Sequence, residues 1–145
     1  MMILIFAIMV PSLGQMSEGA MSPDDWFDRG QALYYQDRFN ESIDAYDQVI
    51  EMEPRNAEAW NNKGINLGMV GRYDEALSAF STAIGINPSY AEAWYNTGVV
   101  LDFMQDFESA IQAYNRATQI DPHYEKAWLN KNRDIDIVGI YVSYP

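Results

Sequence analysis

An interval of 34 residues recurs along this chain and limits its possible folds more than any other feature. The four tryptophans, Trp26, Trp60, Trp94 and Trp128, follow one another at this interval. Other residue types keep the same spacing, namely proline at Pro54, Pro88 and Pro122, glycine at Gly30, Gly64 and Gly98, and an aromatic ring at Tyr46, Phe80 and Tyr114. A period of about 34 residues is typical of arrays in which helix-turn-helix units stack side by side.

Apolar residues within each interval are spaced as in two consecutive helices. The first unit is predicted to contain helices over residues 23–36 and 40–52, with Ser22 as the N-cap before Pro23. In the second unit the first helix covers residues 57–70 and the next begins at Tyr73. This second helix stops at Pro88, which lacks a backbone N–H. The period places the units at residues 23–56, 57–90 and 91–124.

Small side chains at fixed positions let the two helices of a unit cross closely. Gly64 and Ala76 are small residues on the two predicted helices of the second unit. Larger apolar side chains, among them Trp60 and Phe80, are predicted to fill the wider space around this crossing. One unit cannot bury its whole apolar face, so neighbouring units must stack.

The pattern resembles that of the tetratricopeptide repeat (TPR) family. The resemblance covers three complete units and a partial fourth, residues 125–145, and it implies an all-α solenoid closed by a capping helix. The sequence departs from the family pattern at a few positions. The usual leucine before the glycine is replaced by Arg29, Lys63 and Thr97, the small alanine of the first unit by Ser42, and the fourth glycine by Asn132.

The C-terminal segment supports two interpretations. Residues 125–138 keep the helical register, and we expect a helix to about Arg133 whose outer face is hydrated by Lys126, Lys131 and Arg133. Beyond it, the β-branched residues between Ile135 and Val142 also fit a strand. The chain ends where a second helix of the fourth unit would begin, as expected if the sequence is part of a longer array.

The N-terminal segment has the character of an export signal. Residues 1–10 are continuously apolar, too few for a bilayer span of about 20 residues but suited to a signal peptide. We predict a signal peptide over residues 1–14 with cleavage before Gln15, followed by a linker over residues 15–22. No Lys or Arg precedes the apolar run, which is unusual for such signals. The expected location is extracellular or at the cell surface, held to a membrane only if the segment is not cleaved. The alternative is a cytoplasmic protein whose apolar tail packs on the first unit.

Composition argues against several functions. With 9 Lys and Arg against 21 Asp and Glu, the formal net charge is −12, which disfavours nucleic acid and favours basic partners if the partners are charged. Solvation of exposed helix faces also accounts for the acidity. The chain has no cysteine, and its one histidine, His123, lies in a predicted turn without partner ligands nearby. Acidic pairs such as Asp74-Glu75 stand at helix starts, where they compensate the helix dipole. We therefore expect no enzyme activity, no cofactor and no metal site.

The family resemblance implies a concave groove, lined by the first helix of each unit, that binds a protein or peptide segment. The corresponding residues are Phe27, Gln31, Tyr34, Tyr35, Asn61, Ile65, Met69, Tyr95, Val99, Asp102 and Phe103, with Asp24, Glu58 and Glu92 as acids at the edge. This set suits a partner with apolar and basic residues.

Other interpretations of the same residues stay open. Several of them could simply pack between helices. Some family members bind acidic C-termini, but Phe27, Gln31, Ile65 and Tyr95 stand where such binding requires charge or amide groups, so we expect no tight binding of acidic tails. The alternative function is a structural element that self-associates through the ends of the solenoid.

Overall fold

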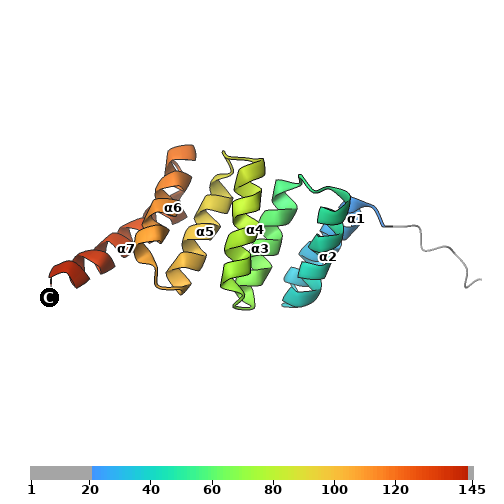
Figure 1. The fold of residues 1–145 in the computed structure, drawn as a ribbon, viewed down its shortest axis with the longest axis horizontal. Coiled ribbons are helices and arrows are strands. Elements are labelled where there is room, and N and C mark those ends of the chain that lie inside the picture. The colour runs from blue at the N-terminus through green and yellow to red at the C-terminus, as the bar shows by residue number, and fades with distance from the viewer. Residues whose placement is uncertain (1–20, 144–145) are drawn as a thin grey trace, which may run out of the picture.

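The computed structural model describes residues 21–143 and shows an α-solenoid. Within these residues the chain forms seven helices and no strand: α1 (Pro23–Tyr34), α2 (Phe39–Met52), α3 (Ala57–Met69), α4 (Tyr73–Ile86), α5 (Ala91–Phe103), α6 (Phe107–Ile120) and α7 (Glu125–Ser143). The first six form three helical hairpins that follow one another along the longest axis, with α7 at the far end (Figure 1). The all-α solenoid predicted from the 34-residue period is confirmed.

Polar side chains cap the starts of α1, α3 and α6. Ser22 and Asp25 form a reciprocal capping box, in which the Asp25 N–H donates to Ser22 Oγ at 3.2 Å and the Ser22 N–H donates to the Asp25 carboxylate at 2.9 Å. Asn56 caps α3 and Asp106 caps α6 by accepting from backbone N–H groups at 3.0 and 3.2 Å. These polar residues satisfy donors that a helix start otherwise leaves unpaired.

An aromatic ring lies directly on a glycine at every hairpin crossing. A Cβ atom added to Gly30 would lie 2.9 Å from the Tyr46 ring; at Gly64 it would lie 2.6 Å from Phe80, and at Gly98 2.5 Å from Tyr114. The three rings are buried, between 0 and 1% exposed. In the first hairpin the hydroxyl of Ser42 donates to the Gly30 carbonyl at 2.7 Å, so the serine that replaces alanine there adds a bond between the helices. At all three crossings the ring lies too close to the helix backbone for a Cβ atom, which is why glycine occupies these positions.

The tryptophans donate hydrogen bonds to the loops that connect the units. The indole N–H of Trp60 donates to the Pro54 carbonyl at 3.0 Å, and that of Trp128 donates to the Pro122 carbonyl at 3.0 Å. Trp60 contacts the core cluster around Phe80 but is only partly buried. The tryptophans are therefore less completely buried than the rings at the crossings.

Cationic side chains cover the tryptophan rings. The Arg29 guanidinium lies 5.2 Å from the centre of the Trp26 ring, and Lys63 Nζ lies 5.5 Å from that of Trp60. In the third hairpin the equivalent residue is Thr97, and Arg116 of α6 covers Trp94 instead, at 5.7 Å. Arginine and lysine can therefore replace the usual leucine, because their apolar stems and charges both interact favourably with an indole face.

Each hairpin turns through one residue with positive φ. These residues are Asp37 (φ 58°), Gly71 (φ 77°) and Gln105 (φ 63°), again 34 positions apart. After α3, the Arg72 N–H donates to the Leu67 carbonyl at 2.9 Å and the Gly71 N–H to that of Gly68 at 3.1 Å, which closes the helix end. The turn ends α1 and α3 at Tyr34 and Met69, one or two residues earlier than predicted.

We expect Gln105→Gly to raise the free energy of unfolding by about 0.5–1 kcal/mol. A left-handed conformation costs a residue with a Cβ atom roughly 1–2 kcal/mol, of which the greater freedom of glycine in the unfolded chain returns a part. Urea unfolding followed by circular dichroism measures the change. The reciprocal variant Gly71→Gln should lose a similar amount, and equal midpoints for both variants and the parent would contradict the assignment of strain to this turn.

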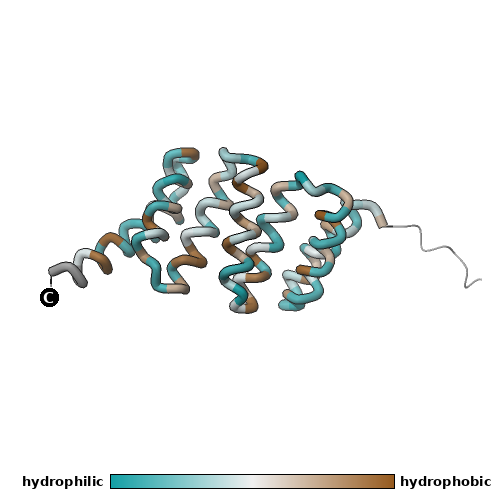
Figure 2. Tube along the Cα trace, viewed as in Figure 1, coloured by the Kyte–Doolittle hydropathy of each residue, from teal (hydrophilic) through white to brown (hydrophobic). Residues whose placement is uncertain are grey.

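The hairpins share their apolar faces with their neighbours. Helix α2 packs against α3, α4 against α5, and α6 against α7. The core cluster around Phe80 includes Ile43 of the first hairpin and Val100 of the third. Hydrophobic positions accordingly recur along every hairpin instead of gathering in one segment (Figure 2). No hairpin contains a complete core of its own, in agreement with the expected stacking.

The C-terminal segment differs from the sequence-based prediction. Helix α7 continues through Ser143, so the predicted helix end near Arg133 and the alternative strand from Ile135 onward are both wrong. Asp134, which is 0% exposed, accepts a hydrogen bond from Arg133, and Arg133 also pairs with Asp102 of α5, which ties this part of the helix to the third hairpin. Lys131 was predicted on the hydrated face, but it is 8% exposed and its Nζ lies 3.5 Å from the centre of the Trp128 ring. The predicted signal peptide, and all but the last two residues of the predicted linker, lie outside the described residues.

Candidate functional site

Three adjoining hollows form one groove along the first helices of the hairpins. The first hollow is lined by Gln31, Tyr34, Tyr35, Tyr46, Glu58, Asn62, Ile65, Asn66, Tyr90 and Glu92. The second is lined by Ile65, Gly68, Met69, Tyr73, Phe80, Asn96, Val99, Val100 and Phe103. The third is lined by Tyr95, Val99, Asp102, Phe103, Phe107, Asn130 and Arg133. Ile65 is shared by the first and second hollows, and Val99 and Phe103 by the second and third, so neighbouring hollows adjoin.

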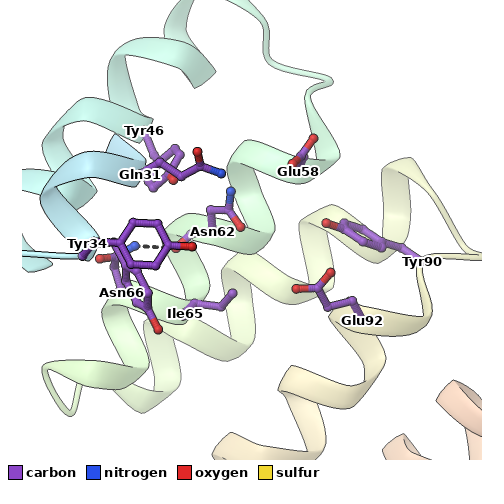
Figure 3. A pocket seen from close by; sticks show the side chains of 10 residues that line it. Gln31, Tyr34, Tyr46, Glu58, Asn62, Ile65, Asn66, Tyr90 and Glu92 are labelled. Atoms are coloured by element: carbon purple, nitrogen blue, oxygen red, sulfur yellow. Dashed lines mark hydrogen bonds between the residues drawn. The ribbon is translucent and has the colours of Figure 1, made fainter. Parts of the chain in front are cut away.

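The first hollow has a volume of about 260 Å³ and combines aromatic walls with acidic and amide groups. Figure 3 shows Gln31 and Tyr34 on one side and Tyr90 and Glu92 on the other, with α3 supplying residues between them. The rings of Tyr34 and Tyr35 meet edge to face with their centres 5.5 Å apart. No lysine or arginine lines this hollow.

Buried tyrosine hydroxyls lie beside the acids of the first hollow. Burial raises the pKa of Tyr46 to about 12, with a smaller contribution from Glu58. Burial also raises the pKa of Tyr90, and the carboxylates of Glu92 and then Glu58 raise it further. Both hydroxyls therefore stay protonated at neutral pH and can donate hydrogen bonds.

An amide at the base of this hollow is only half satisfied. Asn66 is 1% exposed, and its Nδ2 donates to the Asn62 carbonyl at 2.8 Å. Its Oδ1 atom accepts no hydrogen bond from any described residue. A buried amide oxygen without a donor costs about 1–3 kcal/mol, so the site favours a ligand or a water molecule that supplies one.

The second hollow, of about 280 Å³, is apolar. Phe103 stacks on Tyr73 with ring centres 6.1 Å apart yet remains 69% exposed, and Met69 is 55% exposed. Val99 and Ile65 form its sides. Exposed aromatic and methionine side chains around an apolar hollow are suited to anchoring a partner's apolar side chain.

The third hollow, of about 370 Å³, is closed at its base by a polar network between α5, α6 and α7. The Tyr114 hydroxyl donates to Asp102 Oδ2 at 2.7 Å and accepts from Asn130 Nδ2 at 3.3 Å. Arg133 forms ion pairs with both Asp102 and Asp134. Asp102 is thus already engaged within the protein.

Nine of the eleven predicted groove residues line these hollows. Gln31, Tyr34 and Tyr35 belong to the first, Met69 to the second and Tyr95 and Asp102 to the third, while Ile65, Val99 and Phe103 lie at the shared edges. The other two are Phe27 and Asn61. Phe27 is partly buried and packs edge to face on Tyr46 with ring centres 5.4 Å apart. Asn61 is 0% exposed and accepts from Asn96 Nδ2 at 3.0 Å, so it joins two units beneath the groove.

Sequence reasoning missed several lining residues. Asn62 and Asn96 line the groove; they match the asparagine positions of family members that bind acidic C-termini, but the predicted set did not include them. Tyr46 reaches the first hollow from the second helix of its hairpin, and Tyr90 reaches it from the residue before α5. Neither position belongs to the first helices on which the prediction concentrated.

The described residues show no arrangement typical of catalysis or metal binding. Within residues 21–143, no three histidine, aspartate or glutamate side chains come together in a way that could hold a metal ion. His123 is exposed in the turn before α7, where its backbone N–H donates to Asp121 at 2.9 Å. None of the helices in this part of the chain is both long enough and apolar enough to span a bilayer.

Sequence profiles of one family match most of the stacked hairpins. A profile described as "TPR repeat" matches residues 30–68, and one described as "Tetratricopeptide repeat" matches residues 69–125. The chain belongs to the tetratricopeptide repeat family. Members of this family are typically protein-interaction modules without catalytic activity. No curated protein matches the chain significantly in sequence.

Solved TPR structures share the fold at low sequence identity. The first TPR of Spaghetti (RPAP3), bound to the HSP90 peptide SRMEEVD, is 20% identical with a TM-score of 0.78, over 81% of this chain and 93% of that one. MamA is 24% identical with a TM-score of 0.77, over 81% and 69%. YrrB, described as a TPR protein with an unusual peptide-binding site, is 26% identical with a TM-score of 0.74, over 79% and 59%.

Proposed function

We propose that this TPR protein is a non-catalytic scaffold that binds a segment of a partner protein along the three-hollow groove. The observation that carries the proposal is the adjacency of the hollows, in which exposed apolar side chains of α3 and α5 adjoin a polar, acidic hollow. Solved TPR proteins of the same fold bind peptides, including an HSP90 peptide on the first TPR of Spaghetti (RPAP3) and an HSP70 peptide on the second TPR domain of human RPAP3. These likenesses support peptide binding as the general mode.

The partner segment is expected to carry basic and apolar residues. Glu58 and Glu92 line the first hollow and no cation does, whereas the second hollow is apolar. The one cation in the groove, Arg133 of the third hollow, is paired with Asp102 and Asp134. A peptide such as SRMEEVD, with three acidic residues, would therefore meet like charges, and we expect no tight binding of acidic tails.

The test begins with a library of random 12-residue peptides, from which those that bind the whole chain are selected. The affinity of a selected peptide is then measured for the parent protein and for two variants. The groove variant combines Tyr35→Ala, Met69→Ala and Phe103→Ala, whose parent residues are 80, 55 and 69% exposed. The control variant combines Met52→Ala, Met104→Ala and Ile120→Ala, also exposed but outside the three hollows. We expect the groove variant to lose at least about tenfold in affinity and the control to change less than about twofold. Equal affinity for all three proteins, or no selected peptide, would contradict the proposal.

A second candidate function is assembly through the end of the solenoid. Helix α7 exposes Trp128 (41%), Leu129 (69%) and Ile135 (47%). Apolar side chains at a terminal unit can bury themselves against another copy. Light scattering on the same proteins without peptide distinguishes the two functions, because growth in mass with concentration supports assembly and a constant monomer mass supports the scaffold.

We also propose export, with an extracellular or cell-surface location. The support is the apolar run of residues 1–10 and the small residues Ser12 and Gly14 ahead of Gln15.

A further inference from the structure

We propose that the first hollow is a binding site for an arginine side chain of the partner. The inference rests on the proposed function and specifies its chemistry at one place in the groove. It arises from three separate features of the hollow, namely two carboxylates without a cation, aromatic walls, and a buried acceptor without a donor.

The two carboxylates of the hollow are free to pair with a ligand. Glu58 on α3 and Glu92 on α5 are exposed, and neither forms an ion pair or a hydrogen bond with any residue between 21 and 143. Glu41 and Glu75, by contrast, each pair with an arginine three residues earlier, whereas exposed acids such as Glu51 and Glu108 are unpaired within the described residues but line none of the three hollows. Two unpaired acids converging from neighbouring units, with no lysine or arginine in the lining, attract a cation to this hollow.

The aromatic side chains suit a planar cation. Tyr34, Tyr35, Tyr46 and Tyr90 all line the hollow, so a guanidinium between the two acids can lie against a tyrosine face. Arginine stacks on aromatic faces more favourably than lysine, because its charge is spread over a plane that is weakly hydrated. The dimensions agree, since about 260 Å³ is ample for one side chain.

The half-satisfied amide selects for a ligand with several donors. Asn66 is 1% exposed, lines the hollow, and has a carbonyl oxygen that accepts no bond from the described part of the chain. Guanidinium carries five N–H donors in a fixed plane, so one that pairs with a carboxylate still has donors left for this oxygen. A quaternary ammonium has no donor and would leave the oxygen unpaired.

The neighbouring hollow and the N-terminal sequence indicate an external partner. Because Ile65 belongs to both hollows, a segment with arginine in the first can place a nearby apolar side chain in the second. The chain's own residues 1–20 contain no arginine, so they cannot supply a guanidinium. The charge of −12 favours a partner of the opposite sign over a second copy.

The test is a titration of the whole chain, labelled with nitrogen-15, with N-acetyl-arginine methylamide. N-acetyl-citrulline methylamide, of nearly the same shape but uncharged, and N-acetyl-lysine methylamide serve as comparison probes. We expect saturable shifts of the backbone and side-chain amide signals of Asn62 and Asn66. Arginine should bind at least about tenfold more tightly than citrulline, and more tightly than lysine.

A charge-matched pair of variants assigns the site. Glu58→Gln with Glu92→Gln should abolish the shifts at Asn62 and Asn66. Glu51→Gln with Glu108→Gln removes the same charge from exposed positions on α2 and α6 and should leave the titration unchanged. Equal binding of arginine and citrulline, or equal losses in both double variants, would overturn the arginine site.

The outcome separates this inference from the proposed function. One outcome is that the selected peptides need Tyr35, Met69 and Phe103 but show no preference for arginine, and that N-acetyl-arginine methylamide causes no saturable shifts. This outcome would support the proposed scaffold and overturn the arginine site. Titration by arginine without any selected peptide would support the hollow and overturn the peptide scaffold. Concentration-dependent association that depends on Glu58 and Glu92 would overturn the external partner in favour of a second copy.

Discussion

Replacing Phe80 by alanine is expected to lower the free energy of unfolding by about 3–5 kcal/mol, a large share of the roughly 5–15 kcal/mol that stabilises a domain. The ring is 1% exposed and lies on Gly64, where the helices of the central hairpin cross. Its core cluster includes Ile43 and Val100 from the two neighbouring hairpins, so the cavity would also weaken both stacking interfaces. Urea unfolding at equilibrium measures the loss. Trp60→Ala should lose less, because Trp60 is only partly buried.

The crossing itself is tested by adding a methyl group opposite the ring. Gly64→Ala alone should cost about 1–3 kcal/mol, because its Cβ would lie 2.6 Å from the Phe80 ring, which must then shift out of its packed position. In the Phe80→Ala background the same change should be neutral or stabilising by up to about 1 kcal/mol, since alanine favours a helix over glycine. Additive losses in the double variant would show that the ring and the glycine are not in contact.

The fold was predictable because its main determinant repeats. Trp26, Trp60, Trp94 and Trp128 report the same local packing four times, and agreement at several positions identifies the unit and its stacking partners together. Arg29 and Lys63 depart from the family pattern without changing the fold, because each covers a tryptophan ring as the usual leucine would. Repetition therefore compensates for the ambiguity of any single helical segment.

The groove was less predictable because a helix rotates by about 100° per residue. Asn61 and Asn62 are neighbours in sequence, yet one is buried between units and the other lines the first hollow. Phe27 belongs to a groove position by family pattern, but it packs on Tyr46. Such choices depend on side chains of the next helix, which local spacing does not reveal.

The end of α7 was mispredicted because its stabilising contacts are remote in sequence. Ile135 and Ile137 have high β-propensity, whereas the helix is maintained by packing and polar contacts with earlier units. Arg133 pairs with Asp102, which lies 31 residues earlier on α5. The charged residues of this network do not recur in the preceding unit, where Gly68, Val99 and Val100 stand at the positions equivalent to Asp102, Arg133 and Asp134.

The network around Asp134 is expected to make stability depend on pH between about 4 and 7. Burial, and then a hydrogen bond with Asp102, raise the pKa of Asp134 to about 6 from its usual 3.8, while Arg133 lowers it. The folded protein therefore binds more protons than the unfolded chain in this range, so stability falls as pH rises through it. A difference of about two pH units corresponds to at most about 3 kcal/mol. Asp102 Oδ1 and Asp134 Oδ2 both lack a donor among the described residues, and a proton on Asp134 would supply one between them.

Two variants should shift this dependence in opposite directions. Asp134→Asn mimics the protonated acid, so it should be more stable than the parent at pH 7.5 and close to it at pH 4.5. Arg133→Gln removes the guanidinium shared by the two carboxylates and should cost about 1–3 kcal/mol at pH 7.5, less at pH 4.5. Thermal unfolding of the parent and of each variant is measured across this pH range, and the stability of the variant is expressed as a difference from that of the parent. Carboxylates with lowered pKa values, such as Asp25, Glu41 and Glu75, stabilise the protein as pH rises. Because parent and variant share these carboxylates, their contribution is absent from the difference. Parallel curves for the parent and Asp134→Asn would show that Asp134 does not titrate in this range, and that the buried carboxylate is stabilised by Arg133 alone.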